Sequence, residues 1–71
     1  MKDPLLTKIG EKIRDERLKK NLTQETLAAK TGVHRTYVGM IERGEKNITI
    51  INLKKVCRAL NISLEAFFKD F

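Results

Sequence analysis

The chain has few of the residues on which several common protein classes depend. It contains one cysteine, Cys57, so it can form neither an internal disulfide nor a cysteine-based metal cluster, and a reducing compartment is its natural setting. It contains one histidine, His34, with no cysteines, histidines or carboxylates clustered around it. No apolar run approaches the roughly 20 residues of a membrane span, and the N-terminus lacks a secretory signal core. We therefore expect a cytoplasmic protein without a metal, a cofactor or a membrane partner.

Positive charge is abundant by comparison. Fifteen lysines and arginines face nine aspartates and glutamates, which leaves a formal charge of +6 on 71 residues. A positive net charge is expected of a chain that binds a polyanion such as DNA. A chain this short forms one domain, residues 1–71, and buries only roughly 60% of its unfolded surface, so dimerisation would add to a small core.

A motif of asparagine, an apolar residue and a hydroxyl residue occurs at 21–23, 47–49 and 61–63. In each copy the threonine or serine can cap a new helix, and the asparagine can end or turn the segment before it. A hydrophobic staple then requires an apolar residue four places after each cap. The sequence supplies Leu27, Leu53 and Phe67 at these places.

The spacing of apolar residues predicts helices throughout. They are expected at Pro4–Lys20, Gln24–Lys30, His34–Arg43, Ile50–Leu60 and Leu64–Lys69. The expected core comprises Leu6, Ile9, Ile13, Leu27, Ala28, Val38, Ile41, Ile50, Leu53, Val56 and Leu60. Gly32 and Gly44 mark helix ends where a left-handed backbone costs little. The sequence thus predicts an all-α fold, a compact five-helix bundle.

The second and third expected helices are separated only by Thr31-Gly32-Val33, the length of a helix-turn-helix connection. The pattern TQE-x-LA-x-KTGV at 23–33, followed by IERG at 41–44, resembles the DNA-binding domain of phage-repressor-like regulators. The segment HRTYVGMIER at 34–43 is similar to the controller proteins of restriction–modification systems. The resemblance implies a homodimer that binds a pseudo-palindromic operator, regulates its own gene and times the endonuclease gene.

In a helix-turn-helix the third helix enters the major groove and the second crosses the DNA backbone. Arg35 is the favoured base reader, because a guanidinium can donate two hydrogen bonds to guanine; a phosphate contact is the alternative. Thr36 can touch a thymine methyl group or simply lie on the surface. Tyr37 can contact DNA or fill a half-buried packing position.

Contacts to the DNA backbone are expected on either side of the third helix. Before it, Thr23, Gln24 and His34 can contact phosphates. Ordinary helix capping is the alternative for the first two, and a solvated surface position is the alternative for His34. After it, a polar and mostly basic loop can hold the flanking phosphates. The expected backbone residues are Thr23, Gln24, His34, Arg43, Lys46, Asn47 and Thr49.

Two charged residues fall on otherwise apolar helix faces. The resemblance implies that Arg17 and Glu42 form a partly buried salt bridge between the first helix and the end of the third. Glu16 departs from the family, which commonly has an apolar residue there, so the packing of the first helix is expected to differ slightly.

The C-terminal half has more apolar residues than one small core absorbs. Ile62 and Phe67 are expected to close the core, and Cys57 to lie in it or near an interface. The remainder predicts a dimer interface: Ile48, Ile51, Leu64, Phe68 and Phe71. A two-fold dimer places its recognition helices about 34 Å apart, one DNA turn. RNA polymerase is a further candidate partner.

Three other functions compete with a restriction–modification controller. An enzyme is disfavoured because the sequence offers no nucleophile–base pairing, no phosphate-binding glycine loop and no metal-ligand cluster. A protein-binding, antitoxin-like module is disfavoured by the basic reading helix and by the lack of a toxin-binding tail. A phage-type repressor shares the DNA mechanism and differs in the genes beside it.

Overall fold

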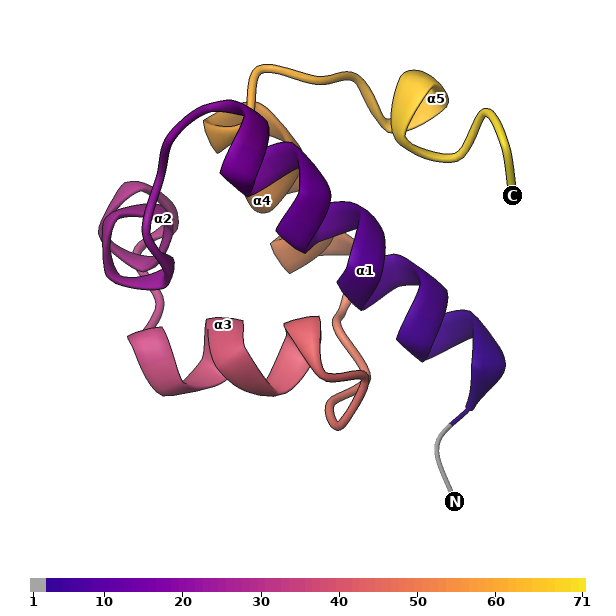
Figure 1. The fold of residues 1–71 in the computed structure, drawn as a ribbon, viewed down its shortest axis with the longest axis horizontal. Helices are drawn as coiled ribbons and strands as arrows, with labels where there is room; N and C mark the ends of the chain where they lie inside the picture. Colours follow the sequence, from indigo (N-terminus) through magenta and orange to yellow (C-terminus); the bar gives the residue numbers. More distant parts are fainter. Residues whose placement is uncertain (1–2) are drawn as a thin grey trace.

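The computed structural model describes residues 3–71, which form five α-helices and no strand. The helices are α1 (Pro4–Lys19), α2 (Gln24–Thr31), α3 (Arg35–Glu42), α4 (Ile50–Ala59) and α5 (Leu64–Phe67). In Figure 1, α1 crosses the middle of the molecule, α3 lies below it and α5 above it. The predicted all-α, five-helix architecture is confirmed. None of these helices is long and apolar enough to cross a membrane.

The three predicted caps are all present. Thr23, Thr49 and Ser63 each accept a hydrogen bond from the backbone N–H three residues later, at 2.9, 3.1 and 3.0 Å. Two of the asparagines that open these motifs, Asn21 and Asn61, have φ of 57°, the left-handed conformation that ends α1 and α4. Short-range hydrogen bonding therefore fixes where α2, α4 and α5 begin.

The predicted helix ends need small corrections. Helix α3 starts at Arg35 because His34 keeps an extended backbone and acts as the cap, with its Nδ1 accepting from the backbone N–H of Thr36 at 3.1 Å. Helix α5 ends at Phe67, two residues before the predicted Lys69. Each difference falls at a terminus, where the hydrogen-bond ladder of a helix runs out of partners.

The core is built from every helix, from the loop residue Ile48 and from Leu60, which caps the end of α4. Its buried members are Ile9, Ile13, Leu27, Ala28, Val38, Ile41, Ile48, Leu53, Val56, Cys57, Leu60 and Phe67. All three staple residues are among them. Burial raises the pKa of the Cys57 thiol, although the nearby Lys54 charge opposes the shift, so this cysteine behaves as a small core side chain.

Two neighbouring isoleucines exchange their predicted places. Ile50, expected in the core, is 65% exposed, whereas Ile48, expected at a dimer interface, is 8% exposed and belongs to the core. The reason is the cap at Thr49. It places Ile48 before the helix, on the side of Leu53, and makes Ile50 the first residue of α4, at the edge of the inward stripe.

Helices α1 and α3 touch at a glycine that no local sequence pattern marks. A Cβ atom on Gly10 would lie 2.3 Å from the carbonyl oxygen of Ile41 and 2.6 Å from that of Glu42. Both are backbone atoms, so no side-chain rotation can relieve the contact. Gly10 therefore sets how closely α1 approaches the end of α3.

We expect Gly10→Ala to lower the free energy of unfolding by about 1–3 kcal/mol, because an overpacked helix contact must spread. Gly39→Ala is the matched control: it is also a buried helical glycine, but its added Cβ meets only the side-chain ends of Arg43 and Gln24, at 3.1 and 3.5 Å. Alanine gains about 1 kcal/mol of helix propensity over glycine, so the control should be neutral or more stable. Urea unfolding at one protein concentration measures both. Equal urea midpoints for the two variants would show that the packing of α1 against α3 does not require a glycine at position 10.

Position 16 of α1 is a buried glutamate, whereas the family commonly has an apolar residue there. Three lysines of the same segment lie near its carboxylate. Its carboxylate lies 3.4 Å from Lys12 Nζ, 3.1 Å from Lys19 Nζ and 3.9 Å from Lys20 Nζ. Burial alone would raise the pKa of Glu16, but the hydrogen bonds and charges of Lys19 and Lys12 outweigh it, so the pKa is lowered. The charge is therefore kept at the edge of the core by its own helix.

Candidate DNA interface

Helices α2 and α3 are joined by a turn that holds them at a fixed angle. Gly32 caps α2 in the left-handed conformation, with φ of 75°, and Val33 donates its backbone N–H to the carbonyl of Ala28 at 3.1 Å. Thr31 is buried and donates its hydroxyl to the carbonyl of Leu27 at 3.0 Å. The connection is short and is hydrogen-bonded at both of these points, which restricts the orientation of α3 relative to α2.

One side of α3 packs inward and the other faces solvent. Val38, Ile41 and Glu42 are buried, whereas Arg35 and Thr36 are exposed in the first turn. Figure 1 shows α3 at the rim of the molecule, with no other helix outside it. The two side chains expected to read bases therefore lie on the free side of the helix.

Tyr37 is half-buried at the border of that side. Its ring packs against the core, and its phenol oxygen accepts a hydrogen bond from Asn52 Nδ2 of α4 at 3.1 Å. The sequence alone did not point to Asn52, because it lies 15 residues away in the chain. Tyr37 thus combines the packing role and a polar group at the edge of the candidate interface.

A buried network ties the three helices of this region together. Arg17 of α1 donates to both carboxylate oxygens of Glu42 in α3, from Nε to Oε2 at 2.7 Å and from Nη2 to Oε1 at 3.1 Å. Gln24 of α2 donates its amide to Glu42 Oε1 at 3.0 Å. Arg17 also donates to the carbonyl of Leu22 at 2.8 Å. One carboxylate therefore fixes α1, α2 and α3 relative to one another.

The expected backbone contacts fall into two groups. Gln24 and His34 already use part of their side chains, the first on Glu42 and the second as a cap. The Thr23 cap takes the backbone N–H of Thr26, so the first two N–H groups of α2 are the better phosphate donors there. Lys46 and Asn47 are exposed in the loop after α3, and Thr49 caps α4. His34, Lys46, Asn47 and Thr49 are therefore exposed on the segments just before and after α3, and Gln24 is half-buried.

Arg43, at the end of α3, lies beside an acidic neighbour. Its Nε donates to Glu45 Oε2 at 3.0 Å, and this hydrogen bond, together with the Glu45 charge, raises the pKa of Arg43. The pair is exposed, so a phosphate can compete with Glu45 for the guanidinium.

Exposed apolar residues remain on α4. Ile51 is 67% exposed, beside the exposed Ile50 and the half-buried Leu64. These three border a surface groove of about 460 Å³ whose other residues are Lys54, Lys55 and Arg58. The groove therefore combines three apolar side chains with three cationic ones.

The predicted interface residues Phe68 and Phe71 are partly used within the chain itself. They form an aromatic cluster with Phe67, with ring centroids 5.0–5.8 Å apart. Phe68 is half-buried and Phe71 stays partly exposed. Ile50 and Ile51 are therefore more exposed than either of these phenylalanines.

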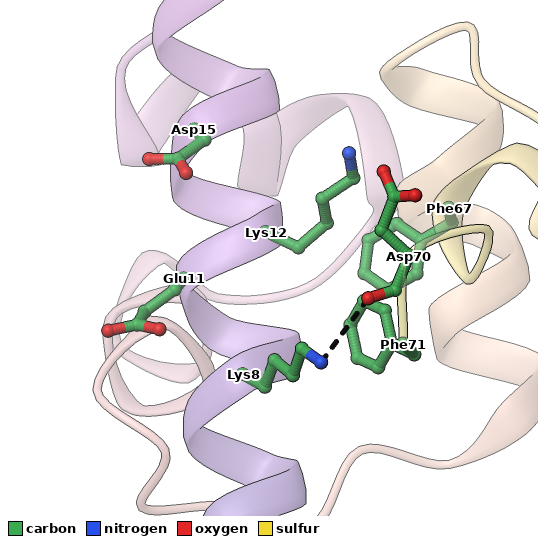
Figure 2. Close-up of a pocket in the computed structure, with 7 residues that line it drawn as sticks. All are labelled: Lys8, Glu11, Lys12, Asp15, Phe67, Asp70 and Phe71. Carbon is green, nitrogen blue, oxygen red and sulfur yellow. Dashed lines mark hydrogen bonds between the residues drawn. The ribbon is translucent and has the colours of Figure 1, made fainter.

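A pocket of about 180 Å³ between α1 and the C-terminal segment is shown in Figure 2. Lys8 donates its Nζ to the carbonyl of Asp70 at 3.3 Å and lies 4.9 Å from the centre of the Phe71 ring. The lining mixes lysines with the carboxylates of Glu11 and Asp15, which point away from Lys8. Within residues 3–71 no three histidines, cysteines or carboxylates are grouped to hold a metal ion. The pocket lies at the contact between α1 and the C-terminal segment.

Comparison with known proteins identifies the group to which the chain belongs. The helix-turn-helix family model matches residues 13–67. The control protein C.BamHI of Bacillus amyloliquefaciens is 44% identical over 54 residues, which cover 75% of this chain and 67% of that protein. The crystal structure of the restriction–modification controller protein C.AhdI from Aeromonas hydrophila is 43% identical, with a TM-score of 0.86 over 89% of this chain and 96% of that one.

A second controller has been solved on DNA. The C.Esp1396I tetramer, in complex with its natural 35 base-pair operator, is 40% identical, with a TM-score of 0.88 over 94% of this chain and 88% of that one. These relatives are control proteins, which confirms the expectation of a regulator in place of an enzyme. The chain belongs to the helix-turn-helix family of DNA-binding regulators and, within it, to the controller proteins of restriction–modification systems.

Proposed function

We propose that the protein binds a pseudo-palindromic DNA operator as a homodimer, with α3 of each subunit in the major groove. The observation that carries the proposal is the exposed first turn of α3, where Arg35 and Thr36 lie, together with the exposed Lys46 and Asn47 in the loop that follows the other end of this helix. A guanidinium and a hydroxyl at a helix start suit base edges, and the basic loop suits the flanking phosphates. The tetramer of the related controller on its operator supports this assignment.

The regulatory role follows from that binding. The dimer acts in the cytoplasm on the promoter region of its own gene and on that of the partner endonuclease gene. There it delays the endonuclease until the DNA has been methylated, and RNA polymerase is the protein whose access to the promoter it changes. Dimerisation runs through the exposed residues of α4 with Leu64, Phe68 and Phe71 at its edge.

An electrophoretic mobility-shift titration tests the proposal. The probe is the DNA directly upstream of this protein's own gene, with scrambled DNA of the same length and composition as the control, at one fixed salt concentration. Stepwise shifts on the first probe at concentrations that leave the second unbound are expected. Equal, weak binding to both probes would contradict sequence-specific recognition and direct attention to a protein partner.

Two substitutions separate base reading from phosphate binding. Arg35→Ala should weaken binding to the operator by about 1–3 kcal/mol per half-site while leaving scrambled DNA nearly unaffected, because it removes hydrogen bonds to a base. Lys46→Ala should weaken binding to both DNAs and reduce the salt dependence of log K by about one for each phosphate that is no longer neutralised. Titrations at several salt concentrations measure both quantities. The assignment of these two roles is wrong if each variant weakens binding to the operator and to scrambled DNA by the same factor.

A further inference from the structure

In the hydrogen bond between α3 and α4, the phenol of Tyr37 acts as the acceptor, so its own hydroxyl hydrogen is not used in this bond. Asn52 Nδ2 donates to the Tyr37 oxygen at 3.1 Å, and the pair is partly buried. Asn52 itself is held in place, since it is the third residue of α4 and its backbone N–H donates to Thr49 Oγ at 3.1 Å. The donor of this bond is therefore positioned by the start of a helix.

A phenol has one donor and two acceptor positions. Because Asn52 occupies an acceptor position, the phenolic proton cannot point toward Asn52 and remains available to an acceptor elsewhere. Tyr37 borders the exposed side of α3, where Arg35 and Thr36 stand. A DNA duplex against that side presents phosphate oxygens, guanine N7 and O6 and thymine O4, all of which are acceptors.

We propose that Asn52 is a positioning residue for DNA recognition: by donating to the Tyr37 oxygen, it holds the ring against α4 and directs the phenolic proton toward an acceptor on the DNA. The inference rests on the proposed function, because it requires α3 to lie against DNA. It assigns to α4 a part in reading the operator, besides its part in the dimer.

Asn52→Asp reverses the direction of this bond while leaving a partner in place. A carboxylate only accepts, so the phenol would donate its proton to Asp and withdraw it from the DNA. The substitution should not harm the fold. A carboxylate three residues after the Thr49 cap suits the capping-box arrangement and the positive end of the helix dipole.

The experiment is a double-mutant cycle with Tyr37→Phe, read as affinity for the operator and for scrambled DNA. In the presence of the Tyr37 hydroxyl, Asn52→Asp should weaken operator binding about three- to tenfold per half-site, the loss expected for one hydrogen bond. Combined with Tyr37→Phe, it should cause only the smaller loss due to its added negative charge, and that loss should be equal on both DNAs. Asn52→Ala is the matched variant that removes the bond without adding charge, and its effect should be smaller than that of Asn52→Asp.

Urea unfolding of each variant shows whether the fold is intact. An equal loss of operator affinity from Asn52→Asp with and without the Tyr37 hydroxyl would overturn the inference while leaving the proposed function standing. Failure of the unsubstituted protein to distinguish operator from scrambled DNA would instead remove the proposed function, and the inference with it.

Discussion

Glu42→Ala is expected to lower the free energy of unfolding by about 3–5 kcal/mol, because it leaves the Arg17 guanidinium buried without its counter-charge. The side chains of Arg17 and Glu42 are only 9% and 3% exposed, so little solvent would screen the guanidinium that remains. The same substitution removes the acceptor for the Gln24 amide. Domains of this size have about 4–10 kcal/mol of stability in total, so much of the fold's margin would disappear.

The control replaces the whole pair with apolar residues. Arg17→Met combined with Glu42→Leu should be much closer in stability to the unsubstituted protein than Glu42→Ala, since no unpaired buried charge remains. Urea unfolding of Arg17→Met, of Glu42→Leu and of the double variant at one protein concentration gives the coupling free energy. Additive effects of the two single substitutions would mean that the pair contributes nothing beyond its separate side chains.

The starts of α2, α4 and α5 and the turn between α2 and α3 could be predicted because they depend on neighbours in the sequence. A threonine or serine cap needs only the N–H three residues later, and the left-handed Gly32 needs only its own missing Cβ. For the same reason, the register of α3, and hence the exposure of Arg35 and Thr36, followed from the pattern of apolar residues.

Contacts between distant segments were harder to predict from the residues alone. The Arg17–Glu42 pair, 25 positions apart, was implied by the family resemblance and not by spacing. The hydrogen bond from Asn52 to Tyr37 and the close approach of Gly10 to α3 gave no local signal, because each depends on how two helices cross. Polar residues such as Asn52 are common on helix surfaces, so their type does not reveal a partner.

The exchange between Ile48 and Ile50 has the same cause. A stripe at helical spacing predicts which side of α4 faces inward, but burial of its first residue depends on whether another element covers that end. Here the loop residue Ile48 takes the inward place, and Ile50 stays outside. Of the residues expected at the dimer interface, Ile51 is therefore the most exposed, and Ile50 joins it there from the expected core.

Ile51→Asp is therefore expected to give the largest loss of operator binding without loss of the fold. The residue is 67% exposed, so the subunit core does not depend on it, whereas a carboxylate buried between two apolar surfaces would oppose association. A separated subunit binds each half-site alone and loses the gain from linked binding, which is about 10²–10⁴ in affinity. Sedimentation should show a mass near the 8.2 kDa of one chain, and mobility-shift titration should show the loss on the operator.

Leu5→Asp is the matched control, because Leu5 is an exposed apolar residue of equal size, 54% exposed, in the first turn of α1. An aspartate there suits the helix N-terminus and lies outside the groove on α4, so the dimer mass and operator affinity should stay unchanged. An unchanged mass and affinity for Ile51→Asp as well would place the dimer interface elsewhere. The aromatic cluster of Phe67, Phe68 and Phe71 would then be the next surface to test, because Phe71 is still exposed enough to meet a second subunit.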